Sequence, residues 1–438
     1  MVKYMPGSEN KLQNTSTIQS VGIINALRRG TVPSEGLERL AVGIEREEQV
    51  LADQIRYVSA GRSDLKCIHG DFGSGKTFFV SRALEIARSD GFATAHVVLS
   101  QNTQLHKLAS LYRAIAGSIR TDTHTPGLKS IIDSWIYGIE ERLIGSCGDE
   151  DEEVLATHTA EEIERFLMQI SEENSGLAAA VRTYYHAANR GDFTIAGAAL
   201  GWISGEDTVG RTFKKEAGVR GGVDEGSALR FLKGLTRIIH QAGYRGLAVA
   251  CDETETIQAL SRPLRERGYV NLRQIVDAVD RNEWPGTLFL VTGTPSFFEG
   301  PKGIRSLPPL YDRIQTIRSE DDDGFSNPLQ TQIILPRFDE KRLEAVATRV
   351  IQIYSEAYGE VDRSRINLRF IRAMTDRITF RFGGRIDVVP RIFLREFVDI
   401  LDKCALHDAY DPLEKYRFEG AGIPDVKEEE RAVMEIEW

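Results

Sequence analysis

The sequence has few cysteines and no long apolar run. Its cysteines are Cys67, Cys147, Cys251 and Cys404, and none belongs to a C-x-x-C pair. This distribution does not suit a disulfide framework or a zinc site, and it favours reduced thiols. No apolar stretch reaches the length of a membrane span, and residues 1–17 contain no apolar signal core. We therefore expect a cytoplasmic protein with no membrane partner.

The chain also lacks an excess of positive charge, internal repeats and low-complexity tracts. Its 438 residues carry a formal net charge of −10, with 27% charged and 41% hydrophobic residues. The negative balance argues against nonspecific coating of nucleic acid, although it leaves a local basic surface open. The basic turn at residues 210–215 is either such a contact or a solvated loop. Length and composition indicate a globular protein with two or three domains.

A glycine-rich stretch is the strongest motif, because residues 70–77 fit the pattern G-x-x-x-x-G-K-[ST] of a phosphate-binding P-loop. Glycines let successive backbone N–H groups point at phosphate oxygens. Lys76 is expected to reach the β- and γ-phosphates, and Thr77 to offer its hydroxyl to Mg²⁺. The predicted ATP-binding residues of this loop are Gly70, Asp71, Phe72, Gly73, Ser74, Gly75, Lys76 and Thr77.

The segments around this motif have the order that a P-loop requires. Residues 65–69 are predicted to form a strand, residues 78–87 a helix, and residues 92–100 a second strand. The positive end of the helix dipole would then add to the phosphate site. A glycine turn without a ligand is the competing interpretation.

A second nucleotide signal is the apolar strand predicted at residues 246–253, which ends in two acids. Asp252 is expected to hold the Mg²⁺ shell and Glu253 to polarise the attacking water, as in a Walker B strand. Strand-end acids also serve as helix caps, so the pattern indicates a nucleotide site only together with the P-loop. The long gap between Lys76 and Asp252 predicts a helical insertion at about residues 120–226.

The next apolar strand, residues 287–294, ends in hydroxyl side chains. Thr292 or Thr294 is expected to orient the water or the γ-phosphate, or else to be there for strand propensity alone. Arg313 follows where an arginine finger often lies, with Arg318 as a poorer candidate. The alternative for Arg313 is an ion pair with Asp312 or with an acid of the lid, which only supports local packing.

The remaining segments flank the predicted core of residues 61–335. A helical lid is expected at residues 336–404, where Arg385, or else Arg391, reaches the γ-phosphate or only forms a surface ion pair. Before the core, Val42 and Gly43 either line the adenine site or form an ordinary helix-capping turn. The predicted units are residues 1–60 as an N-terminal helical segment bordering the nucleotide site, 61–335 as the ATPase core, 336–404 as the lid and 405–438 as a tail.

The order of these motifs resembles that of the AAA+ ATPases, especially the origin-recognition clade. More narrowly, the chain is similar to the ATP-binding proteins of bacterial BREX phage-defence systems, of the BrxD type. The similarity rests on residues 26–33, 40–43, 70–79, 243–247 and 252–255, and on the Gly-Gly-Arg and Pro-Arg pairs at residues 383–385 and 390–391. It implies an α/β fold of the P-loop NTPase type, with a parallel sheet sandwich, a helical insertion and a C-terminal helical lid.

The resemblance implies binding and hydrolysis of Mg²⁺-ATP within a defence complex. Implied partners are further copies of the chain and other BREX proteins such as a phosphatase-like protein, a methyltransferase or a helicase. DNA stays open as a partner. No clear winged-helix pattern follows Asp402, which argues against direct DNA binding through a domain of that type. Two rival functions remain at this stage: an ATP-dependent scaffold with little turnover, and a P-loop kinase that acts on a small molecule.

Overall fold

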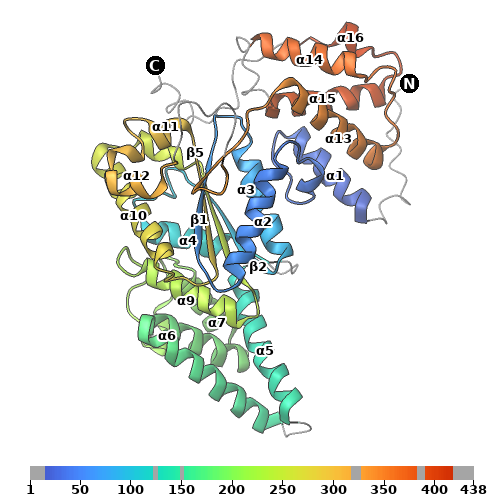
Figure 1. Cartoon of the computed structure of the whole chain (residues 1–438). Coiled ribbons are helices and arrows are strands. Elements are labelled where there is room, and N and C mark those ends of the chain that lie inside the picture. The colour runs from blue at the N-terminus through green and yellow to red at the C-terminus, as the bar shows by residue number, and fades with distance from the viewer. Residues whose placement is uncertain (1–14, 122–126, 148–151, 317–326, 382–389, 418–438) are drawn as a thin grey trace.

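The computed structural model is a mixed α/β fold built on a six-stranded, mostly parallel sheet (Figure 1). It describes residues 15–121, 127–147, 152–316, 327–381 and 390–417. The strand order is β3-β2-β4-β5-β1-β6, which is consistent with a P-loop-like α/β fold. The bounds are β1 Asp64–His69, β2 Phe92–Val98, β3 Ile119–Arg120, β4 Gly246–Asp252, β5 Thr287–Gly293 and β6 Gln332–Ile334.

The edge strand β3 makes the sheet mostly, rather than wholly, parallel. It pairs antiparallel with β2, through Thr94 opposite Arg120 and Ala95 opposite Ile119. Our expectation of a parallel sheet holds for the other five strands. A strand of two residues is too short to show the alternation by which a strand is recognised in a sequence.

Two helical layers cover the sheet. Helices α2 and α3 pack on one face, while α4, α9 and α10 pack on the other and α12 lies against α10. Parallel strands need such cover on both faces, which is why they are almost wholly apolar in sequence. The bounds are α2 Glu45–Ser59, α3 Lys76–Ser89, α4 Leu108–Ser118, α9 Ala228–Gln241, α10 Arg262–Asp280 and α12 Pro308–Ile314.

The small residues of β4 have a packing role. Ala248 and Ala250 are fully buried in the same cluster as Phe79 and Ala83 of α3. The residues that alternate with these alanines, Leu247 and Val249, belong to the opposite face. Alanine on the α3 side lets this helix approach the centre of the sheet closely, so the helix that begins at the glycine-rich loop is held firmly.

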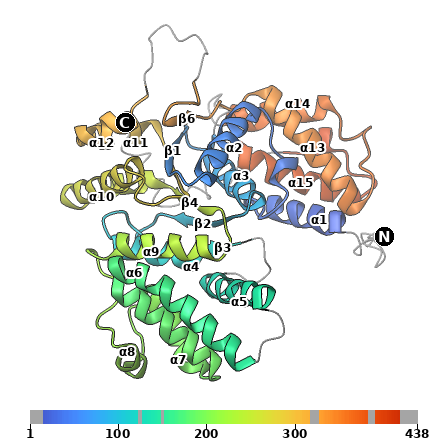
Figure 2. The ribbon, with the colours of Figure 1, turned by 60° about the horizontal axis from the view of Figure 1, so that its bottom comes forward.

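A helical arm extends from the sheet on the side away from the C-terminal helices (Figures 1 and 2). Its first two helices pack against α9. The longest helix is kinked at Asn174, whose side-chain oxygen accepts a 3.0 Å hydrogen bond from the N–H of Leu177 and so caps the second half. The arm consists of α5 Leu128–Cys147, α6 Glu152–Asn189, α7 Phe193–Ile203 and α8 Arg211–Ala217.

The C-terminal helices form a separate apolar core together with the first helix of the chain. Arg28 binds Asp402 through two hydrogen bonds of 2.7 and 2.9 Å, and Tyr354 donates to the same carboxylate at 3.0 Å. Within residues 1–60, α1 packs on the C-terminal helices and α2 on the sheet. The helices are α1 Thr15–Arg28, α13 Glu340–Tyr358, α14 Leu368–Arg381, α15 Pro390–Leu406 and α16 Pro412–Lys415.

Two expectations from the composition can be compared with the residues that the structure describes. None of their helices combines the length and apolarity needed to cross a membrane. Cys67, Cys251 and Cys404 are buried free thiols, and burial raises the pKa of all three. Such thiols are inert core residues.

Candidate functional site

The glycine-rich stretch forms the connection from β1 to α3, which we call the glycine loop (residues 70–77). Gly73 and Gly75 have φ angles of 80° and 92°, in the left-handed region that side chains disfavour. A Cβ atom on Gly70 would lie 2.3 Å from Ser74 Oγ. Glycine is thus required at the start of the loop by close approach, and at its end by backbone conformation. The loop ends at the N-terminus of a 14-residue helix, a favourable place for an anion.

Lys76 is buried within this loop. Its ammonium donates hydrogen bonds to the carbonyl oxygens of Gly70 (2.9 Å) and Asp71 (3.1 Å), and Nζ lies 5.2 Å from the ring centroid of Phe72. Glu255 Oε1 is 3.5 Å away. Arg337 pairs with the carboxylate of Asp71 at 2.9 Å. The lysine is therefore held by the loop's own carbonyls and by one acid from a distant segment.

The strand-end acids form a hydrogen-bonded network with one of the two threonines. The Thr292 hydroxyl donates a 2.8 Å hydrogen bond to Asp252 Oδ1. The backbone N–H of Glu253 is shared between Asp252 Oδ1 and Thr292 Oγ1, each at 3.0 Å. On the other side of the carboxylate, His96 Nε2 lies 3.5 Å from Asp252 Oδ2. Asp252 is thus fixed between the neighbouring strands β5 and β2.

Asp252 is 1% exposed, yet its pKa is lowered rather than raised. Burial would raise its pKa, but the contacts from His96, Thr292 and Thr77 outweigh it and hold the pKa below the ordinary value of 3.8. The contact with Thr77 brings the two predicted metal-binding residues together. A hydroxyl and a carboxylate are hard oxygen ligands that suit Mg²⁺, which commonly takes one or two carboxylates together with substrate phosphates and waters. The residues present therefore fit the ion.

Glu253 stands in an unusual backbone conformation. Its φ of 58° is left-handed, one of two such values among the described non-glycine residues. This conformation costs on the order of 1–3 kcal/mol and is found most often at functional sites. The shared N–H hydrogen bond holds it at one end, and the Thr256 hydroxyl holds its carbonyl oxygen at 2.8 Å at the other.

The two candidate threonines lie in different environments. Thr292 hydrogen-bonds the carboxylate of Asp252 and the backbone N–H of Glu253, as described above. Thr294 is the N-cap of α11 (Pro295–Glu299), where its hydroxyl accepts a 3.3 Å hydrogen bond from the N–H of Phe297. Both side chains are fully buried. The arrangement favours Thr292 for a role next to Asp252 and gives Thr294 a structural role.

The turn at Val42 and Gly43 lies against residues from the start of the C-terminal helices. The guanidinium of Arg342 donates to the Val42 carbonyl at 3.0 Å, and a Cβ on Gly43 would lie 2.8 Å from its Nε. Arg342 stacks over Phe338, 4.2 Å from the ring centroid. A Cβ on Gly75 would lie 3.6 Å from the same ring. Phe338 thus lies between the turn and the glycine loop.

The candidate arginines are engaged elsewhere or lie outside the described residues. Arg313 of α12 pairs with Asp277 of α10 at 2.5 Å, rather than with its neighbour Asp312 or a lid acid. Arg391, at the start of α15, donates to the carbonyl of Gly30 at 2.5 Å. Arg385 lies outside the described residues, as do Gly383, Gly384 and Arg318.

Sequence reasoning missed several residues that contact this site, among them Glu255, His96 and Phe338. Glu255 has the clearest sequence signal, since it follows the Asp-Glu pair after one threonine. His96 lies within a strand, two residues before its end, where the sequence does not show that its ring faces Asp252. Phe338 contacts the loop only through tertiary packing.

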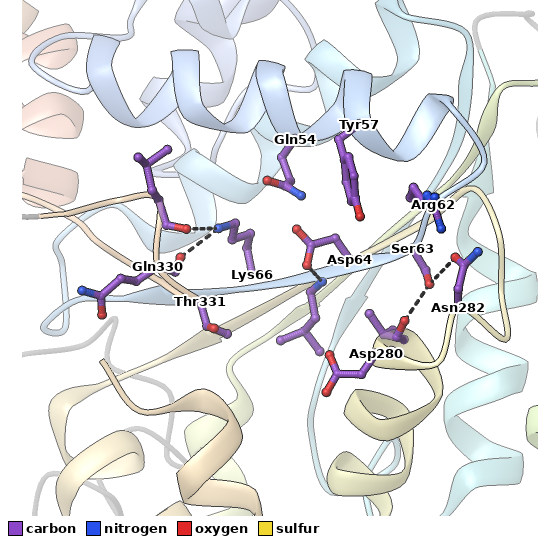
Figure 3. A pocket seen from close by; sticks show the side chains of 13 residues that line it. Gln54, Tyr57, Arg62, Ser63, Asp64, Lys66, Asp280, Asn282, Gln330 and Thr331 are labelled. Carbon is purple, nitrogen blue, oxygen red and sulfur yellow. Dashed lines mark hydrogen bonds between the residues drawn. The ribbon is translucent and has the colours of Figure 1, made fainter. Parts of the chain in front are cut away.

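A separate cavity of about 510 Å³ lies at the other end of β1 (Figure 3). Asp64 and Lys66 line it from the strand, Tyr57 from α2 and Asp280 from the end of α10. The ammonium of Lys66 donates to the carbonyls of Leu329 and Gln330 at 2.9 and 2.8 Å. Leu65 and Lys66, which line the cavity, precede Gly70 by four to five residues of strand, or roughly 15 Å. The cavity therefore belongs to a different part of the molecule.

The glycine loop, the acidic strand end and the mostly parallel sheet define a mixed α/β protein with a candidate anion and metal site at one sheet edge. The family model described as BREX system ATP-binding protein BrxC/D matches residues 16–420, and the chain belongs to this family. No curated protein and no solved structure significantly matches the chain. Membership supports a nucleotide-binding role in the defence system and partnership with other BREX proteins.

Proposed function

We propose that this chain binds Mg²⁺-ATP at the glycine loop and hydrolyses it, acting as a switch or motor in a BREX defence complex. The observation that carries the proposal is that the glycine loop and the acidic end of β4 meet: Lys76 Nζ lies 3.5 Å from Glu255 Oε1, three residues beyond Asp252, and Thr77 helps to lower the pKa of Asp252. These contacts join the two motifs, 175 residues apart in the chain, at one edge of the sheet. The strand order, with β5 between β1 and β4, supports the P-loop and AAA+-like assignment.

Each part of the site has a role in this proposal. Loop N–H groups and the N-terminus of α3 bind the phosphates, and Lys76 turns from the loop carbonyls toward the β- and γ-phosphates. Thr77 and Asp252 hold Mg²⁺, which neutralises charge on the phosphates. Thr292 keeps the carboxylate of Asp252 oriented through its 2.8 Å hydrogen bond.

Glu253 orients the attacking water and accepts its proton. Its main chain is fixed by hydrogen bonds at both ends, so the side chain starts from a defined position. The Val42–Gly43 turn and Phe338 border the adenine side of the loop. Helices α13 to α15 act as the lid, and a second copy of the chain supplies Arg313 to complete the site.

The test is a calorimetric titration with ATP, with and without Mg²⁺, followed by measurement of phosphate release in the presence and absence of DNA. Binding that needs residues of the loop, with release of phosphate, supports the proposal. Binding without release would favour an ATP-dependent scaffold. Loss of ATP that depends on an added small molecule would favour a kinase. Absence of nucleotide binding to the full chain would overturn the proposal.

A further inference from the structure

Glu255 is a buried acid next to the glycine loop. It lies in the 3₁₀ helix η3 (Thr254–Ala259), two residues beyond Glu253, and is 3% exposed. Its Oε1 atom is 3.5 Å from the ammonium of Lys76, and its Oε2 atom is buried without a hydrogen-bond partner among the described residues. A carboxylate in this position depends on Lys76 for its compensation.

The electrostatic surroundings of Glu255 are unfavourable for a charge. Burial raises its pKa most, Lys76 lowers it, and the carboxylates of Asp252 and Glu253 raise it again. Glu255 thus faces one compensating cation, Lys76, and the repulsion of two further acids. Any further negative charge brought to Lys76 repels Glu255 most directly, because Glu255 is the acid that forms the ion pair with the lysine.

We propose that Glu255 is a positioning residue that holds the ammonium of Lys76 and competes with nucleotide phosphates for it. The inference rests on the proposed function, since it assigns Lys76 to the phosphates. The ammonium of Lys76 donates hydrogen bonds to the carbonyls of Gly70 and Asp71, and the carboxylate of Glu255 is its counter-ion at 3.5 Å. To reach the phosphates, Lys76 has to give up at least one of these partners.

The competition lowers nucleotide affinity in two ways. Turning Lys76 away leaves Glu255 without its cation in a buried position, which is costly. The phosphates then add negative charge near the same carboxylate. Both costs vanish when the carboxylate is replaced by a neutral amide of the same shape. Affinity therefore depends on the charge of Glu255 and not on its volume.

The experiment compares the full-length chain with Glu255→Gln in titrations with ADP and ATP in the presence of Mg²⁺. We expect the variant to bind ATP about tenfold more tightly, equivalent to about 1.4 kcal/mol. The gain for ADP should be smaller, because ADP lacks the γ-phosphate. If Glu255 had a purely structural role, its replacement would weaken the binding of ADP and ATP equally or leave both affinities unchanged.

Glu356→Gln is the matched control, because it makes the same charge change on α13, where the partly exposed carboxylate of Glu356 pairs with Arg39 and accepts a hydrogen bond from Ser20. It should leave both dissociation constants unchanged. If Glu255→Gln does not fold, as judged by circular dichroism, Glu255→Leu removes the charge at similar volume and carries the same expectation.

Unchanged or weaker ATP binding by a folded Glu255 variant would overturn the inference while leaving the proposed function intact. Unchanged affinity with a loss of turnover would also overturn it, and would place Glu255 among the catalytic groups. If neither the variant nor the parent chain binds nucleotide, the proposed function itself fails.

Discussion

Thr292 and Asp252, at the ends of the adjacent strands β5 and β4, are joined by a 2.8 Å hydrogen bond from the threonine hydroxyl to the carboxylate. Both side chains are buried, and the same hydroxyl accepts the N–H of Glu253. One threonine thus sets the orientation of the acid proposed to bind Mg²⁺ and the backbone of the acid proposed to act on water.

This relationship predicts that Thr292→Val and Thr294→Val differ in kind. Thr292→Val removes a donor to a buried carboxylate and should lower the free energy of unfolding by about 1.5–3 kcal/mol. It should also reduce ATP turnover, because Asp252 loses its orientation. Thr294→Val removes the cap of a short helix and should cost about 1 kcal/mol of stability, with turnover per folded molecule retained. Urea unfolding and phosphate release measure both; equal losses of turnover in the two variants would contradict the assignment.

Lys76→Ala should sharply weaken nucleotide binding. A charge-assisted contact with a phosphate is worth on the order of 2–3 kcal/mol, so the dissociation constant should rise by roughly 30- to 150-fold. Titration calorimetry measures this change directly. An ATP affinity equal to that of the parent chain would show that residues 70–77 are not the phosphate site.

The same substitution should also affect stability, because it leaves Glu255 buried without its cation. Breaking a buried pair of this type costs on the order of 3 kcal/mol. The double variant Lys76→Ala/Glu255→Gln should regain much of this loss while still binding nucleotide weakly. Urea unfolding of the two variants separates the contribution to stability from the contribution to binding.

Glu253→Gln should preserve nucleotide binding and reduce turnover by roughly 10²-fold or more, because the amide keeps the shape but cannot accept a proton. The comparison of calorimetry with phosphate release tests this split. A variant that hydrolyses ATP at the parental rate would leave Glu253 as a strand-end acid only. The left-handed backbone of this residue would then need another explanation.

The strands and the glycine loop could be predicted because their signals are local. An apolar run bounded by glycine or acids marks β1, β4 and β5, and the loop motif has a fixed spacing. The place of α1 in the fold could not be predicted. Its buried residues are apolar, but the sequence does not say which apolar core receives them. The pairing of Arg28 with Asp402, which fixes that choice, joins opposite ends of the chain.

The same limit applies within the candidate site. The motifs predicted which acids and hydroxyls to consider, but they did not separate Thr292 from Thr294. Thr292 faces Asp252 on the neighbouring strand, whereas Thr294 caps α11. His96 contacts Asp252, and Glu255 contacts Lys76, although the two members of each pair are far apart in the sequence. Such contacts follow from tertiary packing, which a pattern along the sequence does not contain.

Arg313 is expected to act on the ATP site of a neighbouring copy. It lies on α12, beyond β5, which carries Thr292 near its end, and arginine fingers in related chemistry contribute about 10³-fold or more to turnover. In the structure its guanidinium pairs with Asp277, which gives a competing account in which Arg313 only supports the packing of α12 on α10. Arg313→Ala and Asp277→Asn distinguish the two accounts. A finger requires that Arg313→Ala lose turnover while Asp277→Asn, which keeps the guanidinium, retains it; equal losses would indicate a packing role.

A mixing experiment then tests whether the finger acts between copies. Arg313→Ala has an intact glycine loop and Lys76→Ala an intact finger, so each alone should be nearly inactive. When the two are mixed, some interfaces join a good loop to a good finger, and phosphate release should partly return. Full turnover by Arg313→Ala alone would exclude the finger role. A mixture that stays inactive, although light scattering and subunit-exchange measurements show that mixed assemblies form, would mean that Arg313 acts within its own chain.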